Sequence, residues 1–205
     1  MTRIKVCGIT RPEDAAQAAA LGAWALGFVF AKSPRRIQPG QAARIASGLP
    51  EGILKVGVFV DEAPNLIEAV AEEVGLDLIQ LHGTEPAETC DLLGRDRVIK
   101  AIRVRCEESL AQAADYVGHC FAVLLDAWDP LAAGGTGKSW DWSLASPERL
   151  PRLILAGGLG LDNVDEAIRL VGPWALDVSS GVEAAPGIKD PELLQAFFQA
   201  VREAE

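Results

Sequence analysis

The sequence predicts a closed (β/α)8 barrel of the TIM-barrel type, and two observations carry that prediction. Eight short apolar runs recur along the 205 residues, and about 25 residues separate the ends of successive runs. That spacing is the length of one strand, one helix and two loops. Most runs also end in a reactive residue or a glycine, and the active site of this barrel forms where its strands end. The expected fold is a single α/β domain covering residues 1–205.

Each of the first four units consists of a strand, a loop and a helix. The first strand is expected at residues 3–7, and its helix has Thr10 as the expected N-cap and Gly22 as the expected stop. The next three strands are expected at residues 25–30, 53–60 and 77–82, and their helices at 41–47, 64–74 and 85–93. Gly75 and Gly94 follow the last two of these helices, and glycine favours a helix end.

The last four strands are expected at residues 98–103, 121–126, 153–157 and 174–180, and helices at 107–116, 140–145, 162–171 and 191–203. All eight strands are rich in Val, Ile and Leu. Such runs are typical of parallel strands that are covered by helices outside and filled by side chains inside. No linker or low-complexity segment divides the chain, which predicts one domain.

Composition and charge narrow the range of partners. The formal net charge is −10, and because phosphate backbones repel an acidic protein, we expect no nucleic-acid partner. A small anionic substrate is compatible with this charge, since basic groups and helix N-termini act locally. No stretch supplies the ~20 strongly apolar residues of a membrane span. We expect no membrane association and no signal peptide.

The four cysteines show no C-x-x-C spacing; they are Cys7, Cys90, Cys106 and Cys120. Neither a disulfide framework nor a zinc site is expected, and a reducing cytoplasm is the expected location. No cluster of metal ligands is visible, so we expect no metal and no cofactor. The sequence leaves the oligomeric state open between monomer and homodimer.

Cys7 ends the first strand and is the first candidate for chemistry. A lone cysteine is most often a small buried hydrophobe. Residues two apart share a strand face, so Cys7 faces the same way as Lys5. A lysine is poorly suited to the apolar strand–helix layer, which favours a position in the barrel mouth for both. There Lys5 is expected to lower the pKa of the thiol and favour the thiolate.

Asp126 ends the sixth strand after five apolar residues. Its carboxylate either begins a solvated loop or is a working group at the rim. Desolvation at the rim would raise its pKa and suit it to general-acid catalysis. In a ring of eight strands, only strands seven and eight separate strand six from strand one. Cys7 and Asp126 are therefore expected to flank the loops after strands seven and eight.

Those two loops are rich in glycine: Gly157 and Gly158 follow the seventh strand, and Ser180 and Gly181 follow the eighth. Glycines let backbone N–H groups approach a phosphate closely, and these loops form the recurrent phosphate site of the barrel. The alternative is a pair of tight turns without a ligand.

Two rim residues carry weaker signals. Arg36 lies in the basic loop after the second strand. A charged loop is usually only solvated, but a guanidinium is suited to binding a carboxylate. His82 follows the fourth strand, and its position is equally compatible with a contact role and a structural role.

The glycine-rich stretch at residues 134–139 does not fit a nucleotide-binding phosphate loop. The pattern G-x-x-x-x-G-K-[ST] needs glycine at the position of Ala132, and it needs a strand directly before the loop. We interpret the stretch as a lid or wall beside Asp126.

With these residues in place, the chain resembles the phosphoribosylanthranilate isomerase family of tryptophan biosynthesis. The matching segments run from end to end: Lys5-Val-Cys-Gly-Ile-Thr-Arg, Gly27-Phe-Val-Phe, Ser33-Pro-Arg-Arg, Val56-Gly-Val-Phe-Val, Gln80-Leu-His-Gly, Leu125-Asp, Gly134-Gly-Thr-Gly, Leu155-Ala-Gly-Gly-Leu, Asp177-Val-Ser-Ser-Gly-Val-Glu and Gly187-Ile-Lys-Asp. One departure is Trp140, where the family usually carries phenylalanine.

The resemblance implies an Amadori rearrangement of N-(5-phosphoribosyl)anthranilate, an aminoaldose, to the ketose 1-(2-carboxyphenylamino)-1-deoxyribulose 5-phosphate. It implies that Asp126 is the general acid and Cys7 the general base. The implied binding residues are Arg36 for the anthranilate carboxylate, Asp177 for sugar hydroxyls, and Gly157, Gly158, Ser180 and Gly181 for the phosphate. His82 is a further candidate for substrate binding.

Two rival functions remain open at this point. An epimerase or aldolase on the same barrel would need a different catalytic set, such as a Schiff-base lysine at Lys5 or Lys100. A non-catalytic phosphosugar-binding barrel would keep the glycine loops and tolerate the loss of Cys7 and Asp126.

Overall fold

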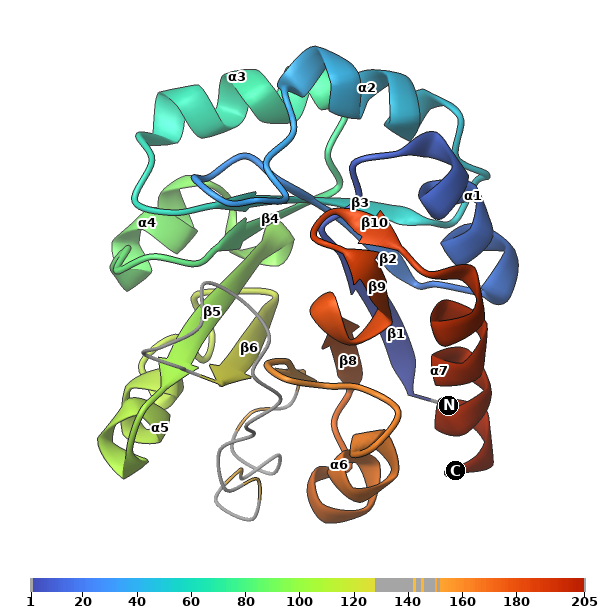
Figure 1. Cartoon of the computed structure of the whole chain (residues 1–205). Helices are drawn as coiled ribbons and strands as arrows, with labels where there is room; N and C mark the ends of the chain where they lie inside the picture. The colour runs from blue at the N-terminus through green and yellow to red at the C-terminus, as the bar shows by residue number, and fades with distance from the viewer. Residues whose placement is uncertain (1, 128–141, 143–144, 146–149, 151, 205) are drawn as a thin grey trace.

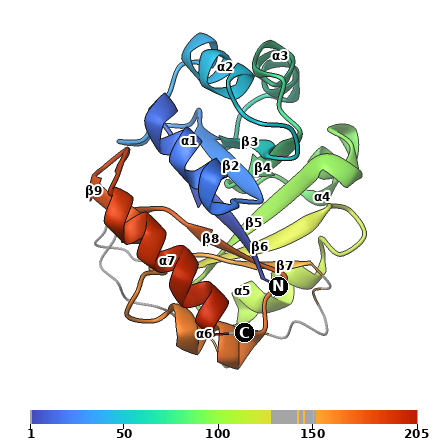
Figure 2. The ribbon, with the colours of Figure 1, turned by 90° about the vertical axis from the view of Figure 1, so that its right-hand side faces the viewer.

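The computed structural model describes residues 2–127, 142, 145, 150 and 152–204 (Figure 1). Eight parallel strands close into one barrel in chain order, because β1 pairs with both β2 and β8. Helices surround the strands on the outside, and α7 runs along the side seen in Figure 2. The predicted (β/α)8 barrel is confirmed.

The strands are β1 Arg3–Cys7, β2 Ala25–Val29, β3 Leu54–Phe59, β4 Leu78–Leu81, β5 Val98–Val104, β6 Ala122–Ala127, β7 Leu153–Leu155 and β8 Ala175–Val178. Every strand boundary lies within two residues of its predicted position. The helices are α1 Pro12–Leu21, α2 Pro39–Ser47, α3 Pro64–Val74, α4 Ala87–Leu92, α5 Glu107–Ala114, α6 Val164–Val171 and α7 Pro191–Glu203. The helix expected at residues 140–145 falls largely outside the described residues.

Local sequence explains most of the helix ends. Four helices begin with proline, whose missing N–H is no loss in the first turn. The predicted stops at Gly22 and Gly75 are confirmed, and both residues are left-handed, with φ of 95° and 70°. The expected N-cap at Thr10 is wrong. The helix begins at Pro12, so Arg11 holds that position, without a capping side chain. The Thr10 hydroxyl donates to the carbonyl oxygen of Gly187 instead.

Side chains alternate between two cores. The outward-facing residues pack beneath the helices. The inward-facing residues fill the N-terminal half of the barrel; they include Ala25, Val56, Ile99, Leu124, Ile154 and Ala175. Trp174 makes edge-to-face contacts with Trp24 and Phe121, at ring-centroid distances of 5.0 and 5.7 Å, at the N-terminal ends of the strands. The inward positions at the other end, the barrel mouth, are left for polar side chains.

A second, small sheet follows β8 and was not predicted. The 3₁₀ turn η3 (Ser180–Val182) leads into the antiparallel strands β9 (Glu183–Ala185) and β10 (Ile188–Lys189). This hairpin lies over the mouth end of β1 in Figure 1. No helix in the described part of the chain is long and apolar enough to cross a membrane.

Candidate active site

The strand alternation places Cys7 and Asp126 in the barrel mouth. Asp126 stands two residues beyond the inward-facing Leu124, and Cys7 stands two beyond Lys5. The neighbour of Cys7 on β2 is Gly27. A Cβ at Gly27 would lie 2.7 Å from the Cys7 sulfur and 3.1 Å from its Cα. Glycine at this position therefore leaves the space that the thiol occupies.

Lys5 and Asp177 form a buried ion pair beneath the thiol. The Lys5 Nζ lies 2.8 Å from the Asp177 Oδ2, and their side chains are 0% and 8% exposed. Burial alone would lower the pKa of Lys5, but the Asp177 carboxylate raises it, and the balance lies above the ordinary value. Lys5 is thus a fixed cation whose charge is largely matched by its partner.

Lys5 lowers the pKa of the Cys7 thiol as expected, but the thiolate is not favoured overall. Burial raises the pKa of the Cys7 thiol, Lys5 lowers it, and Asp177 raises it again. The pKa of the thiol therefore lies above its ordinary value. Burial of the thiol is the main reason, and Asp177, which is 172 residues from Lys5 in the sequence, adds to it.

His82 connects the fourth strand to Asp126. Its Nε2 lies 3.0 Å from the Asp126 Oδ2, and its Nδ1 lies 2.9 Å from the Gln80 Nε2. Because the Gln80 amide donates to Nδ1, the neutral ring carries its proton on Nε2 and donates it to the carboxylate. His82 has a partner that the sequence did not reveal, and it orients Asp126, whose side chain is 26% exposed.

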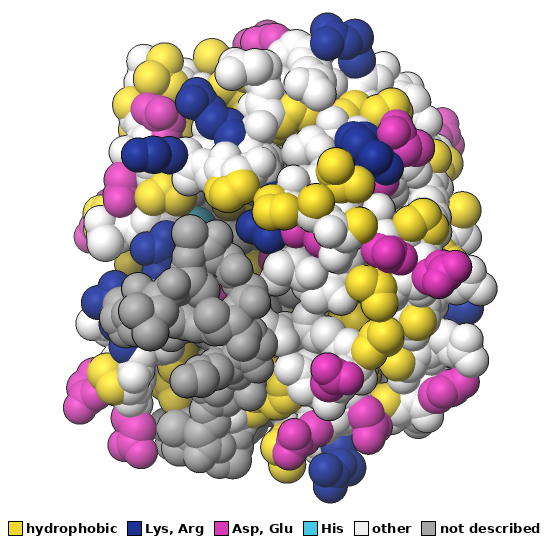
Figure 3. Space-filling model, in the orientation of Figure 1, with side chains coloured by type: hydrophobic (Ala, Val, Ile, Leu, Met, Phe, Trp, Pro, Cys, Tyr) yellow, Lys and Arg dark blue, Asp and Glu magenta, His cyan; other side chains and the backbone are white. Residues whose placement is uncertain are grey.

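The two halves of the site meet at Asp177. Its carboxylate interacts electrostatically with Lys5 and Cys7 on one side and with Asp126 and His82 on the other. A continuous set of charged groups thus spans the mouth from β1 through β8 to β6 and β4. Figure 3 shows part of a histidine and a basic side chain near the middle of this face.

The two glycine loops lie against each other between β6 and β1. Gly157 and Gly158 have positive φ values of 85° and 67°. A Cβ at Gly181 would overlap the carbonyl oxygen of Leu159 and lie 3.0 Å from the Gly160 Cα. The structure therefore brings the four predicted phosphate residues to the ends of neighbouring strands. At Gly157 and Gly158 the positive φ favours glycine, and at Gly181 the close backbone does.

Arg36 forms an isolated β-bridge with Val29, the last residue of β2. Its exposed side chain lines a groove of about 270 Å³ together with Phe30 and Glu62, among others, beside α2 and α3. Among the described residues, no contact joins Arg36 to Cys7 or Asp126. The predicted lid at residues 134–139 and the variant position Trp140 lie outside the described residues.

The two lysines named for a rival mechanism are both engaged. Lys100 lies in register with Leu81 and Val123, which belong to the outer core, so it faces away from the mouth. Its Nζ lies 2.7 Å from the Glu85 carboxylate. Lys5 faces inward but is ion-paired to Asp177. A carboxylate therefore holds each amino group, whereas Schiff-base formation requires an amine that is free to attack.

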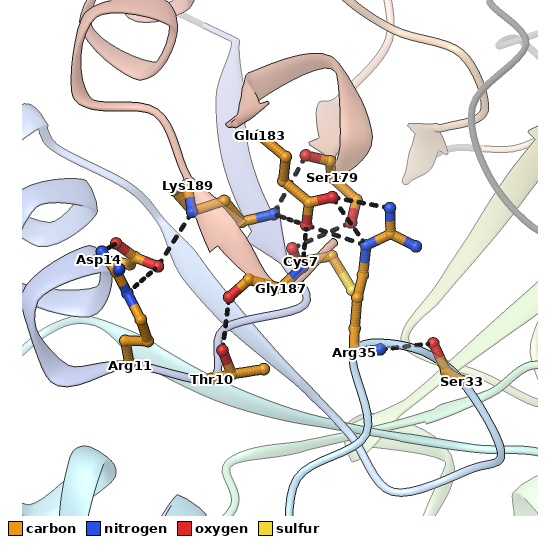
Figure 4. Close-up of polar contacts among 10 residues, drawn as sticks. All are labelled: Cys7, Thr10, Arg11, Asp14, Ser33, Arg35, Ser179, Glu183, Gly187 and Lys189. Carbon is orange, nitrogen blue, oxygen red and sulfur yellow. Dashed lines mark hydrogen bonds and ion pairs between the residues drawn. The ribbon is translucent and has the colours of Figure 1, made fainter. Parts of the chain in front are cut away.

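The sequence interpretation overlooked a second ionic cluster behind Cys7. Arg35, Glu183 and Lys189 belong to three segments and meet there (Figure 4). All three residues lie in segments that match the family: Arg35 in Ser33-Pro-Arg-Arg, Glu183 in the segment that begins at Asp177, and Lys189 in Gly187-Ile-Lys-Asp. This match was the feature of the sequence that could have identified the cluster. Within the described residues, no group of His, Cys, Asp and Glu is arranged to hold a metal ion.

Comparison with known proteins agrees with this geometry. Residues 4–200 match the family model described as N-(5'phosphoribosyl)anthranilate (PRA) isomerase. A curated relative from Trichlorobacter lovleyi, an N-(5'-phosphoribosyl)anthranilate isomerase, is 50% identical over 207 residues and covers 100% of both chains.

Solved structures give the same result. The crystal structure of phosphoribosyl anthranilate isomerase from Thermotoga maritima has a TM-score of 0.93 and 45% identity, covering 99% of this chain and 100% of that one. Another, with a TM-score of 0.89 and 43% identity over 99% and 100% of the two chains, is of the enzyme in complex with reduced 1-(o-carboxyphenylamino)-1-deoxyribulose 5-phosphate. The chain belongs to the N-(5'-phosphoribosyl)anthranilate isomerase family.

Proposed function

We propose that this chain converts N-(5-phosphoribosyl)anthranilate into 1-(2-carboxyphenylamino)-1-deoxyribulose 5-phosphate in tryptophan biosynthesis. Family membership over nearly the whole chain supports the enzyme class. The observation that carries the mechanism is the position of Cys7 and Asp126 on either side of the two adjoining glycine loops. An acid and a base that act on different atoms of one sugar need such an arrangement.

Asp126 acts first, as the general acid. The proton of its carboxyl group passes to the furanose ring oxygen, the bond between that oxygen and C1 breaks, and the anilino nitrogen forms an iminium with C1. Asp126 is then the carboxylate that accepts from His82. The hydrogen bond between the His82 Nε2 and the Asp126 Oδ2, at 3.0 Å, holds the carboxyl group in place. A positioned acid is effective because proton transfer needs a hydrogen-bonding distance to the reacting atom.

Cys7 acts second, as the general base. Its thiolate removes the proton from C2, and the electron pair forms the C1–C2 double bond of an enolamine. The enolamine tautomerises to the ketone, so substrate and product are isomers. Burial raises the pKa of the thiol, which makes the thiolate a strong base but a scarce one at neutral pH.

The remaining predicted residues are assigned to binding. Gly157, Gly158, Ser180 and Gly181 hold the phosphate, Asp177 contacts sugar hydroxyls, and Arg36 pairs with the anthranilate carboxylate. Support comes from the relative that is 43% identical, whose complex holds a reduced form of the ketose phosphate. His82 contributes through Asp126.

The central test is turnover by two variants. The wild-type protein is mixed with freshly made phosphoribosylanthranilate, and the loss of substrate fluorescence is followed. Cys7→Ser and Asp126→Asn are each expected to lower kcat by about 10²–10⁴-fold, the usual value of a general base or acid. Both variants should unfold near the wild-type midpoint, since each substitution keeps the size of the side chain.

Three outcomes separate the alternatives. Near wild-type turnover in both variants would eliminate the mechanism. Phosphosugar binding by the wild type without turnover would favour a binding module. Trapping of a substrate on Lys5 or Lys100 by borohydride would favour the Schiff-base rival. Location in the cytoplasm, and a monomeric or homodimeric state, stay predictions.

A further inference from the structure

The ionic cluster behind Cys7 is centred on Glu183. Arg35 donates from Nε to Oε1 at 2.9 Å and from Nη2 to Oε2 at 2.7 Å, and Lys189 donates from Nζ to Oε1 at 2.9 Å. The Glu183 side chain is only 4% exposed. One buried carboxylate thus holds two cations from opposite sides, in the arrangement that Figure 4 shows.

This cluster is tied directly to the strand end that carries the thiol. The Lys189 Nζ also donates to the carbonyl oxygen of Ser179 at 3.1 Å, and the Ser179 hydroxyl donates to the carbonyl oxygen of Cys7 at 3.1 Å. The Arg35 side chain crosses Gly8, the next residue. A Cβ at Gly8, whose φ is +78°, would lie 2.6 Å from the Arg35 Cδ.

The outer side of the cluster is anchored as well. The backbone N–H of Lys189 donates to Asp14 at 3.0 Å, and Arg11 pairs with the same carboxylate. Thr10 binds the backbone at Gly187. Loops after β1, β2 and β8 are therefore joined around one carboxylate, although 148 residues separate Arg35 from Glu183.

We propose that Glu183 is a positioning residue for Cys7, which neutralises Arg35 and Lys189 beside the thiol and thereby sets how readily the thiol loses its proton. The inference rests on the proposed role of Cys7 as the general base. It concerns a residue that touches neither substrate nor thiol in the proposed mechanism.

Electrostatics support the direction of the effect. The charged groups that face Cys7 are Lys5 on its own strand, Asp177 on β8, Lys189 on β10 and Arg35 after β2. Lys189 lowers the pKa of the thiol, while the Glu183 carboxylate compensates part of that charge. With Glu183 ionised and both cations protonated, the cluster of three carries one net positive charge. Without the carboxylate it carries two at pH values below the pKa of Lys189, which burial lowers.

Opposite changes of charge therefore predict opposite changes of acidity. Glu183→Gln keeps an acceptor oxygen but removes the negative charge, so the Cys7 pKa should fall. Lys189→Met keeps the buried stem but removes a cation, so the Cys7 pKa should rise. Each change should alter thiol acidity about tenfold, the lower end for a charge lost next to a titrating group.

The measurement is a pH titration of thiolate ultraviolet absorbance, taken as the difference between each variant and the same variant with Cys7→Ser. It does not require turnover. Glu68→Gln is the matched control, because Glu68 pairs with Arg97 at the surface at 3.3 Å, and it should leave the titration unchanged. The alkaline limb of kcat/KM against pH should shift in the same directions.

Two further variants keep the proposal testable if one of the single variants folds poorly. The double variant Glu183→Gln, Lys189→Met restores the net charge and should return the thiol toward wild-type acidity. Arg35→Met removes a cation at the more exposed end of the cluster, so it should raise the Cys7 pKa as Lys189→Met does. A purely structural role would lower stability in all of these and leave the titration unmoved or moved in one direction only, which would overturn the proposal.

Failure of this inference is distinguishable from failure of the proposed function. Shifted acidities together with full turnover by Cys7→Ser would retain the coupling and reject Cys7 as the base. Unshifted acidities together with loss of turnover in Cys7→Ser would retain the function and reject the role of Glu183.

Discussion

The thiol of Cys7 occupies space that a side chain on the neighbouring strand would otherwise fill. The side of the strand to which Cys7 points could be predicted from the two-residue period of a strand, because Lys5 lies on the same face. Its acidity did not follow from the sequence. The direction of the pKa shift depends on burial and on Asp177, and the pairing of residues 172 positions apart leaves no local trace. The partner of His82 was hidden for the same reason.

Gly27→Ala is expected to impair catalysis by moving the thiol. The added methyl would lie 2.7 Å from the sulfur and 3.1 Å from the Cys7 Cα, so strand or side chain must shift. Overpacking of this kind costs roughly 1–3 kcal/mol of stability. We expect kcat to fall at least about tenfold, since the proposed base, displaced by ~1 Å, would lose its alignment.

Steady-state kinetics and urea unfolding measure these two effects. Gly48→Ala is the control, because its nearest atom would be 3.6 Å away. A Gly27→Ala protein with unchanged kcat would show that the thiol has room to move without consequence.

Among the elements, the strands were placed within two residues and the hairpin after β8 was missed. The eight barrel strands can be recognised in the sequence because each is a run of apolar residues. Strands of three and two residues, such as β9 and β10, show no alternation, and contacts with Thr10, Asp14 and Arg35 hold them in place. The predicted phosphate residues were brought together by strand order alone, since β7 and β8 are neighbours.

The contact between the two glycine loops yields a matched pair of variants. Gly181→Ala would drive a methyl into the backbone of Leu159 and Gly160, whereas at Gly160 the added Cβ would meet its nearest atom at an ordinary 3.8 Å. We expect Gly181→Ala to raise KM about tenfold or more, equal to roughly 1.4 kcal/mol of lost phosphate binding. Gly160→Ala should stay close to wild type.

Substrate kinetics and competition by inorganic phosphate test this difference. Equal KM values for the two variants would mean that the spacing of the loops does not matter for the phosphate. A large loss in Gly160→Ala alone would point instead to the hydrogen bond between the Gly160 N–H and Asn163.

For the molecule as a whole, buried thiols make stability depend on alkaline pH. Burial raises the pKa of Cys90, a buried residue of α4, to about 12, and burial also raises the pKa of Cys7 and Cys120. In the unfolded chain these thiols titrate near ~8.5. Above that pH the unfolded state has released protons that the folded state retains, so the free energy of unfolding falls as pH rises.

Cys90 is expected to contribute up to about 1.4 kcal/mol per pH unit to this loss, between about pH 9 and pH 12. Urea unfolding across the lower part of that range measures it. Cys90→Ala should lower stability at neutral pH but make the alkaline decline shallower, whereas Cys106→Ala, at an exposed position, should leave the slope unchanged. An identical slope in Cys90→Ala would contradict the assignment.

The pairing of β1 with β8 has a consequence for biosynthesis of the chain. Ring closure joins the first strand to the last, and the surroundings of Cys7 come from Asp177, Ser179, Glu183 and Lys189. A ribosome makes the thiol near the start of translation and those neighbours near the end. Until the residues from Asp177 to Lys189 have been synthesised, Lys5 lacks its Asp177 counterion and one side of the pocket around Cys7 is missing. The surroundings of Cys7 are therefore complete only when synthesis of the chain is almost finished. A prematurely terminated chain would contain Cys7 and Lys5 but lack the residues that surround them in the folded protein.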